Sequence, residues 1–422
     1  MIAMFSRLKY LLFTNTSTKQ TLVKNTLWLM TAEAVAKFFL FVITISVIRY
    51  LGPDEYGKYS FAVAFAAVFG VIADFGLGTM LLQELTSRAN KNAPEVFGSV
   101  LTMRGILASI AFVLVYAFSL LFHITPHVRT LVILAGLYTA IQSLVLLFPF
   151  LFQAYETMQY SFIIRVGSNI ILAVFVLSAI VLRLPVDAIF YAYIFTALSM
   201  VLTAFLLVRY RLFLPKLTLD TQAVIYFLKG SWPLFLGNVC LTLYTLLDTT
   251  LLGLLRGYRE AGIYQSAYKI LYVFQTLNLI HTALYPRMAD LYRTNTAGLK
   301  KLLFLCISVS LAVLLPTVIA ITILRFQIVS LVYGKGFEQS ANVMTLLIAG
   351  GAIGFLSGYF SNLLLVKRKQ KQWFFALLIS LAVNVSVNLL AISRMGPVGA
   401  GFAYIAGYMI LLAVQIIIYC EL

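Results

Sequence analysis

The sequence predicts an all-α polytopic membrane protein, with about 12 transmembrane helices in two six-helix bundles related by a pseudo-repeat. Three observations carry this prediction: apolar runs of about 20 residues, few charged residues and a weak internal repeat. Hydrophobic residues make up 62% of the chain and charged residues 11%, and the mean hydropathy is +0.98. Soluble domains are ~25% charged and ~45–50% apolar. Most of the chain is therefore expected to lie in a membrane.

The apolar runs are long enough for helices that cross a bilayer, which need ~20 residues each. Strands of a membrane barrel are excluded, because they would appear as ~10-residue segments of alternating hydrophobicity. The predicted spans cover residues 26–50, 59–82, 97–122, 128–152, 160–182, 187–208, 232–255, 262–286, 302–324, 341–366, 373–393 and 398–420.

The distribution of lysine and arginine sets the expected orientation. With the N-terminus inside, 18 basic residues lie in cytoplasmic segments and 8 in external ones. Both termini are therefore expected in the cytoplasm. Residues 1–25 are predicted as a cytoplasmic tail, because their apolar stretch is too short for a signal peptide. The longest loop, 209–231, is basic and separates a bundle at 26–208 from one at 232–422.

The two predicted bundles share a short motif at equivalent places. Residues 55–62 read E-Y-G-K-Y-S-F-A, and residues 260–267 read E-A-G-I-Y-Q-S-A. Both fit the pattern E-x-G-x-Y-x-x-A, 205 residues apart, at the entry to the second span of each bundle. Glycine suits a tight turn and glutamate suits a helix start. A repeated architecture, which is common in transporters, is therefore predicted.

Composition and motifs exclude several classes of function. The net charge of +17 comes mainly from residues at span ends, where they set topology and meet lipid headgroups, so nucleic-acid binding is not expected. Cys240, Cys306 and Cys420 lie in apolar runs without metal-ligand spacing, so no metal site is predicted. No nucleotide-binding motif is present. Because no loop is long enough for a catalytic domain, we expect no enzyme activity and no cofactor. Without a nucleotide-binding motif, transport would be coupled to an ion such as H⁺ or Na⁺.

Several spans carry charged residues in mid-run, where each costs ~2.5–3.5 kcal/mol unless it faces a cavity or a partner. Glu33 and Lys37 lie four residues apart on one helical face. They either neutralise each other or line a cavity, and we favour the cavity. Lys37 and Lys269 are the only lysines deep in spans, and an ammonium group suits phosphate.

Polar stripes on the seventh and eighth spans extend this predicted cavity. They contain Asn238 and Thr242 in one span, and Gln265, Lys269 and Tyr272 in the next. The stripes either form hydrogen bonds between helices or face water, and we favour water. The predicted substrate-binding set is Glu33, Lys37, Asn238, Thr242, Gln265, Lys269 and Tyr272.

The remaining charged residues in spans have two interpretations each. Asp74 and Asp248 either carry a coupling ion or pair with the lysines, and no basic residue lies within a helical turn of either in sequence. Arg49, Arg104 and Arg165 lie near span ends, where they either extend toward the interface or contact a diphosphate. The sequence leaves both questions open.

Four motifs resemble those of the polysaccharide flippases of the multidrug/oligosaccharidyl-lipid/polysaccharide exporter superfamily. Residues 49–59 read R-Y-L-G-P-D-E-Y-G-K-Y, residues 74–78 read D-F-G-L-G, residues 261–269 read A-G-I-Y-Q-S-A-Y-K, and residues 396–401 read G-P-V-G-A-G. The resemblance implies two six-helix bundles around a cationic cavity. It also implies that an undecaprenyl-diphosphate-linked oligosaccharide crosses the cytoplasmic membrane of a bacterium or archaeon by alternating access.

Other functions remain open at this point. A multidrug exporter of the same superfamily is the first alternative; its cavity should be acidic and aromatic, whereas the two deep lysines favour an anionic substrate. A membrane enzyme of polysaccharide assembly and a scaffold in a biosynthetic complex are further alternatives. The expected partners are a lipid-linked oligosaccharide, membrane lipid and other polysaccharide-assembly proteins.

Overall fold

The computed structural model describes residues 18–87, 92–122, 124–218 and 221–420, and within these residues it contains helices and turns but no strand. The predicted all-α class is confirmed. Residues 1–17 of the predicted tail lie outside the described residues. The helices, in order, are α2 (Thr18–Asp74), α3 (Leu77–Ser87), α4 (Ala93–Leu121), α5 (Pro126–Val145), α6 (Phe148–Ala154), α7 (Met158–Val181), α8 (Val186–Arg211), α9 (Thr221–Leu255), α10 (Tyr258–Phe274), the 3₁₀ turn η1 (Gln275–Asn278), α11 (Leu279–Thr294), α12 (Thr296–Tyr333), α13 (Ser340–Val366), α14 (Gln370–Met395) and α15 (Pro397–Cys420).

The chain is a multi-pass membrane protein. Within the described residues, ten helical segments are long and apolar enough to cross a membrane, judged by length and composition. The first, Val23–Ser87, has 65 residues, which is enough for two crossings. Large apolar side chains also face outward: Phe304 and Leu331 on α12 are 75% and 77% exposed. Such surfaces belong in hydrocarbon, because soluble monomers rarely expose contiguous apolar patches.

Three predicted spans are interrupted where the sequence predicted continuous helices. The span at 59–82 breaks at Phe75 and Gly76, whose positive φ angles of 45° and 72° end α2. The span at 128–152 breaks before α6, whose first turn contains a proline, the position where a missing N–H is tolerated. The span at 262–286 divides into α10, η1 and α11. Apolar runs predict membrane burial, but they do not report such local breaks.

The described chain forms two compact units that each contain residues from distant parts of the sequence. Unit 1 contains residues up to Tyr50 and Phe65–Val239; unit 2 contains Leu51–Ala64 and residues from Cys240 onward. These units divide the chain at other points than the predicted bundles, whose boundaries stay a prediction. Part of the predicted linker is also helical, because α9 begins at Thr221.

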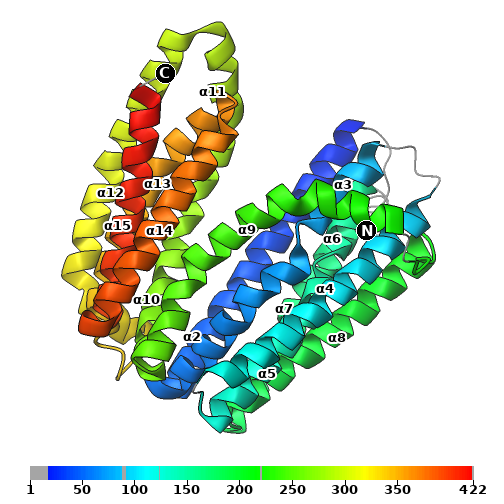
Figure 1. Ribbon diagram of the computed structural model, residues 1–422, viewed down its shortest axis with the longest axis horizontal. Coiled ribbons are helices and arrows are strands. Elements are labelled where there is room, and N and C mark those ends of the chain that lie inside the picture. Colours follow the sequence, from blue (N-terminus) through cyan, green and yellow to red (C-terminus); the bar gives the residue numbers. More distant parts are fainter. Residues whose placement is uncertain (1–17, 88–91, 123, 219–220, 421–422) are drawn as a thin grey trace, which may run out of the picture. The chain divides into compact units, whose positions relative to one another are not determined.

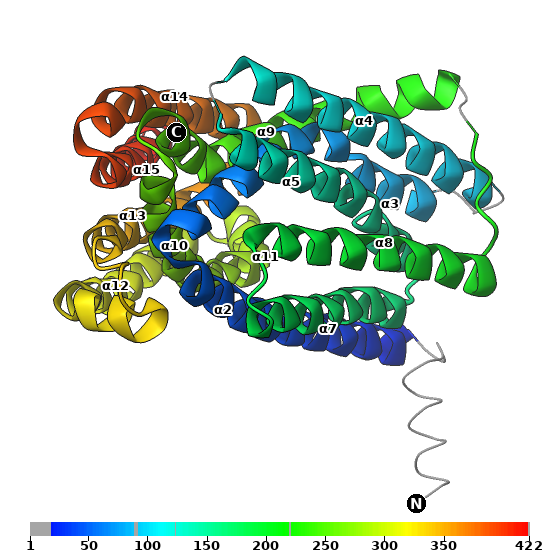
Figure 2. The same ribbon diagram turned by 90° about the horizontal axis from the view of Figure 1, so that it is seen from below.

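Unit 1 is built from long helices that lie side by side. Helices α7 and α8 are neighbours, and α5 packs against both α4 and α8 (Figures 1 and 2). Its core includes Phe97, Phe148 and Phe152, all of which are fully buried. The break after Asp74 is held by α9: Phe75 stacks on Phe235 with ring centroids 4.3 Å apart. This contact places the end of α2 beside α9.

Unit 2 is centred on α13, α14 and α15, which lie side by side (Figure 1). Helix α10 packs on α13 and α15. Residues Leu51–Ala64 of α2 also belong to this unit. They include a kink in α2 at Gly52, which has φ 66° and is followed by Pro53. The positive φ favours glycine, and the proline removes a helical hydrogen bond.

Candidate functional site

The predicted pair on the first span exists, and a third charge joins it. In unit 1, Lys37 Nζ lies 3.6 Å from Glu33 Oε1, while Arg165 Nη2 of α7 lies 2.6 Å from Glu33 Oε2. The three side chains are between 40% and 52% exposed. One carboxylate is therefore shared by two cations, which leaves this group with one positive charge in excess. The sequence did not predict that Arg165 meets Glu33.

Asp74 forms the centre of a second polar group in unit 1. Arg104 Nη2 of α4 donates to Asp74 Oδ1 at 2.6 Å, and Asn238 Nδ2 of α9 donates to Asp74 Oδ2 at 3.0 Å. Arg104 is fully buried, with Nε and Nη1 lacking hydrogen-bond partners, whereas the Asp74 side chain is 37% exposed. A diphosphate contact by Arg104 stays a prediction, and it requires the guanidinium to leave this buried pair.

Asp248 forms the centre of a different group in unit 2, made of neutral donors. Its side chain is 1% exposed. Tyr264 Oη donates to Asp248 Oδ2, and Asn388 Nδ2 of α14 donates to Asp248 Oδ1 at 2.7 Å. Asn388 Nδ2 also lies 3.1 Å from Asn384 Oδ1. Among the described residues, no cation forms an ion pair with Asp248, in contrast to Asp74.

Tyrosines surround the Asp248 group on one side. Tyr244 of α9 lies within 4.9 Å of Tyr408 and 6.1 Å of Tyr404 of α15, measured between ring centroids. Tyr268 of α10 stacks near Tyr264 at 6.3 Å. These side chains place an aromatic wall next to a single carboxylate. Sequence spacing gave no sign that these positions converge.

The predicted cavity residues of unit 2 have unequal surroundings. Gln265 is buried and accepts a hydrogen bond of 2.9 Å from the Thr249 hydroxyl, so it joins α9 to α10. Tyr272 is 52% exposed, and Thr242 is half-buried. Lys269 is half-buried and, within the part of the chain that the structure describes, forms neither an ion pair nor a side-chain hydrogen bond. An ammonium group without a protein partner is available to an anionic ligand.

Some predicted site residues do not converge within one unit. Lys37 belongs to unit 1 and Lys269 to unit 2, so their shared chamber stays a prediction. Arg49 is exposed near the kink of α2. A groove of about 990 Å³ on unit 1 is lined by apolar side chains of α4 and α8, and none of the predicted site residues lines it. Such a groove suits hydrocarbon rather than a sugar headgroup.

The chamber prediction is tested by chemical accessibility. Lys37→Cys and Lys269→Cys, each in a background without Cys240, Cys306 and Cys420, should react with a water-soluble thiol reagent. Ala135→Cys provides a control, because Ala135 is 1% exposed, and it should react at least tenfold more slowly. Inert cysteines at both 37 and 269 in every condition would contradict an aqueous chamber at these positions.

No group of three or more His, Cys, Asp or Glu side chains suited to a metal ion occurs among the described residues.

Comparison with known proteins identifies related sequences and folds. The chain matches the family described as "Polysaccharide biosynthesis protein" over residues 22–292, and the MatE family over residues 233–390. It is 22% identical over 414 residues to the "Putative O-antigen transporter" of Escherichia coli (strain K12), covering 95% of both chains.

Two solved structures share the fold. The lipid II flippase MurJ in an inward closed conformation superposes with a TM-score of 0.71 at 14% identity, covering 92% of this chain and 87% of MurJ. An inward-facing multidrug resistance MATE family transporter of the MOP superfamily also gives 0.71, at 15% identity, covering 90% and 93%. At these identities the likeness shows the fold alone.

Proposed function

Because the chain belongs to the polysaccharide biosynthesis protein family, among the flippases of the multidrug/oligosaccharidyl-lipid/polysaccharide exporter superfamily, we propose that it moves a lipid-linked oligosaccharide across the cytoplasmic membrane. The observation that carries the proposal is the family match over residues 22–292. The relative that covers 95% of this chain is described as an O-antigen transporter, which supports a glycan substrate. Transport by alternating access requires no covalent chemistry, so no enzyme activity is proposed.

The charges of the candidate site support an anionic headgroup such as a lipid diphosphate. Lys269 forms no ion pair with any described residue, and the Glu33 group retains one positive charge in excess. Phosphate is bound in proteins by lysine acting as a point charge and by arginine through paired hydrogen bonds. We place the primary phosphate contact at Lys269 and a secondary one at Lys37.

Ion coupling is proposed at Asp248 rather than at Asp74. Asp74 already has a counter-charge in Arg104 at 2.6 Å. Asp248 is buried among neutral donors, and an isolated buried carboxylate is costly unless it takes up a proton or binds a cation. A carboxylate of this kind responds to an ion gradient. The proposed ion is H⁺ or Na⁺.

A multidrug exporter is the second candidate function, favoured by the match to the MatE family over residues 233–390 and by the tyrosines near Asp248. An acidic, aromatic site of this kind suits an organic cation. The two functions predict different substrates for the same fold.

Reconstitution distinguishes these functions. The purified protein is placed in vesicles with a fluorescent polyprenyl-diphosphate saccharide, and the glycan that reaches the opposite leaflet is measured by its accessibility to an impermeant lectin. We expect movement that depends on the protein and on an imposed pH or Na⁺ gradient. Gradient-driven uptake of an organic cation dye, with no movement of the glycolipid, would instead establish the exporter function.

A further inference from the structure

The two copies of the repeated motif contact each other in unit 2. Gly57 of the first copy lies against the Tyr258 carbonyl group, so any side chain there would collide with it. A Cβ atom added to Gly262 of the second copy would lie 2.8 Å from Gly57 Cα. Positions 57 and 262 are equivalent in the repeat, being 205 residues apart. The glycine that both copies share therefore serves close packing of one copy on the other.

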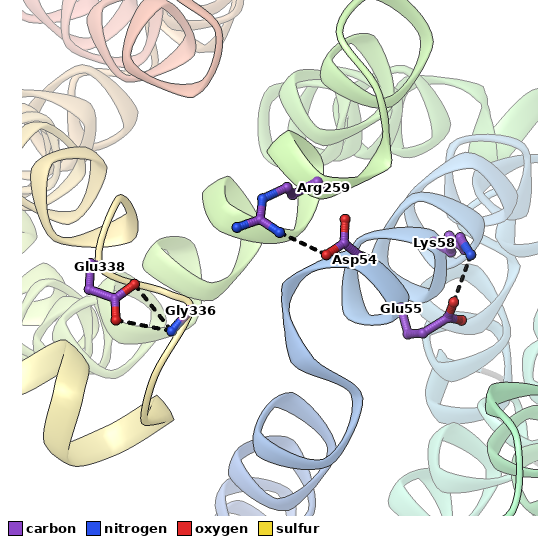
Figure 3. A network of polar contacts seen from close by, with 6 residues as sticks. All are labelled: Asp54, Glu55, Lys58, Arg259, Gly336 and Glu338. Atoms are coloured by element: carbon purple, nitrogen blue, oxygen red, sulfur yellow. Dashed lines mark hydrogen bonds and ion pairs between the residues drawn. The ribbon is translucent and has the colours of Figure 1, made fainter.

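A second pair of equivalent positions forms an ion pair. Arg259 Nη1 donates to Asp54 Oδ2 at 2.8 Å, and these residues are also 205 apart (Figure 3). When two related segments pack about a two-fold axis, equivalent residues meet where the axis passes. The two meetings, at 54 with 259 and at 57 with 262, are those that a two-fold relation between the copies would produce.

Apolar contacts also hold the first copy on unit 2. Phe61 is fully buried and lies 5.2 Å from Tyr258 between ring centroids. Tyr56 is 1% exposed and contacts Phe337 edge-on at 6.3 Å. In the same loop as Phe337, the Gly336 N–H donates to the Glu338 carboxylate (Figure 3). That hydrogen bond, with a smaller effect from the charge of Arg259, holds the pKa of Glu338 below its ordinary value.

The chain beside the ion pair is interrupted, and the ion pair itself is exposed. Gly52, with φ 66°, and Pro53 interrupt α2 at the point where it passes from unit 1 to unit 2. The ion pair itself is weak, because its side chains are 52% and 61% exposed and such pairs contribute little in water. A hinge beside a weak, charged contact permits repeated opening.

We propose that Asp54 and Arg259 form an inter-repeat latch, which holds residues 51–64 on unit 2 and opens during the transport cycle about the Gly52–Pro53 hinge. The latch is a positioning device that touches no substrate. It requires only that the protein is a transporter, so it does not depend on the chemistry of the transported molecule.

The test uses a buried reporter that becomes accessible when the latch opens. Ser60 is 4% exposed, and Ser60→Cys is nearly isosteric. In nanodiscs, where both faces meet solvent, its reaction with a maleimide in a cysteine-free background reports opening without substrate. Asp54→Asn should accelerate labelling about two- to fivefold, and Asp54→Arg somewhat more, because like charges then face each other. Combining Asp54→Arg with Arg259→Asp should return the rate to within about twofold of the unmodified latch.

Glu55 provides the matched control. Its ion pair with Lys58, at 2.6 Å, lies one residue away but stays within α2 (Figure 3). Glu55→Gln should leave the labelling rate unchanged. Equal rates for Asp54→Arg and the unmodified latch would overturn the proposal, as would equal acceleration by Glu55→Gln.

A reducible thiol crosslinker tests whether opening is needed for transport. Joining Asp54→Cys to Arg259→Cys with a bifunctional methanethiosulfonate should lower the transport rate at least tenfold. Reduction of the crosslink should restore the rate. Transport that continues in the crosslinked protein would show a static contact. If the protein without the crosslink moves no glycolipid but the Ser60→Cys labelling rates change as expected, the proposed substrate is contradicted and the latch is not.

Discussion

Replacement of Lys269 by alanine is expected to lower glycolipid transport by roughly 10- to 100-fold. A hydrogen bond to a charged group contributes ~1.5–3 kcal/mol, and each 1.4 kcal/mol corresponds to about a tenfold change in affinity. Lys269 is half-buried without a protein partner among the described residues, so the substitution removes the proposed phosphate contact and breaks no ion pair or side-chain hydrogen bond. The measurement is the initial rate of glycolipid movement in reconstituted vesicles, with protein amount and folding matched.

Two further variants separate charge from structure. Lys269→Arg keeps the cation but changes its geometry, so partial transport is expected. Lys37→Ala is the matched control. Arg165 still lies 2.6 Å from Glu33 and neutralises it, so the transport rate should fall less than in Lys269→Ala. Full activity of Lys269→Ala would exclude Lys269 as a required substrate contact.

The membrane helices were predictable because each helix that crosses a bilayer needs a continuous run of about 20 apolar residues, which the sequence shows directly. The predicted spans at 341–366 and 398–420 nearly coincide with α13 and α15. The breaks within the spans could not be predicted in the same way. The positive φ of Phe75 accompanies a tertiary contact, the stacking of its ring on Phe235. A residue that ends a helix through such a contact has no local signature.

The candidate site was predictable only where its residues are neighbours in sequence. The Glu33–Lys37 pair follows from helical periodicity. The partners Arg104 for Asp74 and Asn388 for Asp248 are 30 and 140 residues away. The sequence placed Asp74 and Asp248 in one class, as deep acids without a local cation. Tertiary packing separates them, because only Asp74 meets a guanidinium.

The repeated motif was predictable as a repeat, but the contact between its two copies was not. A repeat of 205 residues identified equivalent positions, and Asp54 and Arg259 at that spacing form an ion pair. A two-fold relation between the copies would account for this ion pair, because such an axis brings equivalent residues together where the related segments touch.

The different surroundings of Asp74 and Asp248 lead to the second prediction with a large expected effect, which concerns energy coupling. Asp248→Asn is expected to abolish the response to an imposed pH or Na⁺ gradient, so that movement proceeds at one slow rate with or without it. Folding should survive, because the introduced amide can donate to Asn388 Oδ1, which has no hydrogen-bond partner in the native arrangement. Substrate binding should also survive, since Lys269 is unchanged. The measurement is glycolipid movement in vesicles with and without the gradient, beside equilibrium binding of the same lipid.

Asp74→Asn is the contrasting variant, with a loss of stability rather than of coupling. It leaves Arg104 fully buried without its counter-charge, and breaking a buried ion pair costs ~3–5 kcal/mol. Because Asp74 is itself 37% exposed, the low end of that range is expected, seen as a lower Tm in detergent. Adding Arg104→Met removes the orphaned charge and should restore much of the Tm. A normal gradient response in Asp248→Asn would exclude Asp248 as the coupling site, and a lost response in folded Asp74→Asn would assign coupling to Asp74 instead.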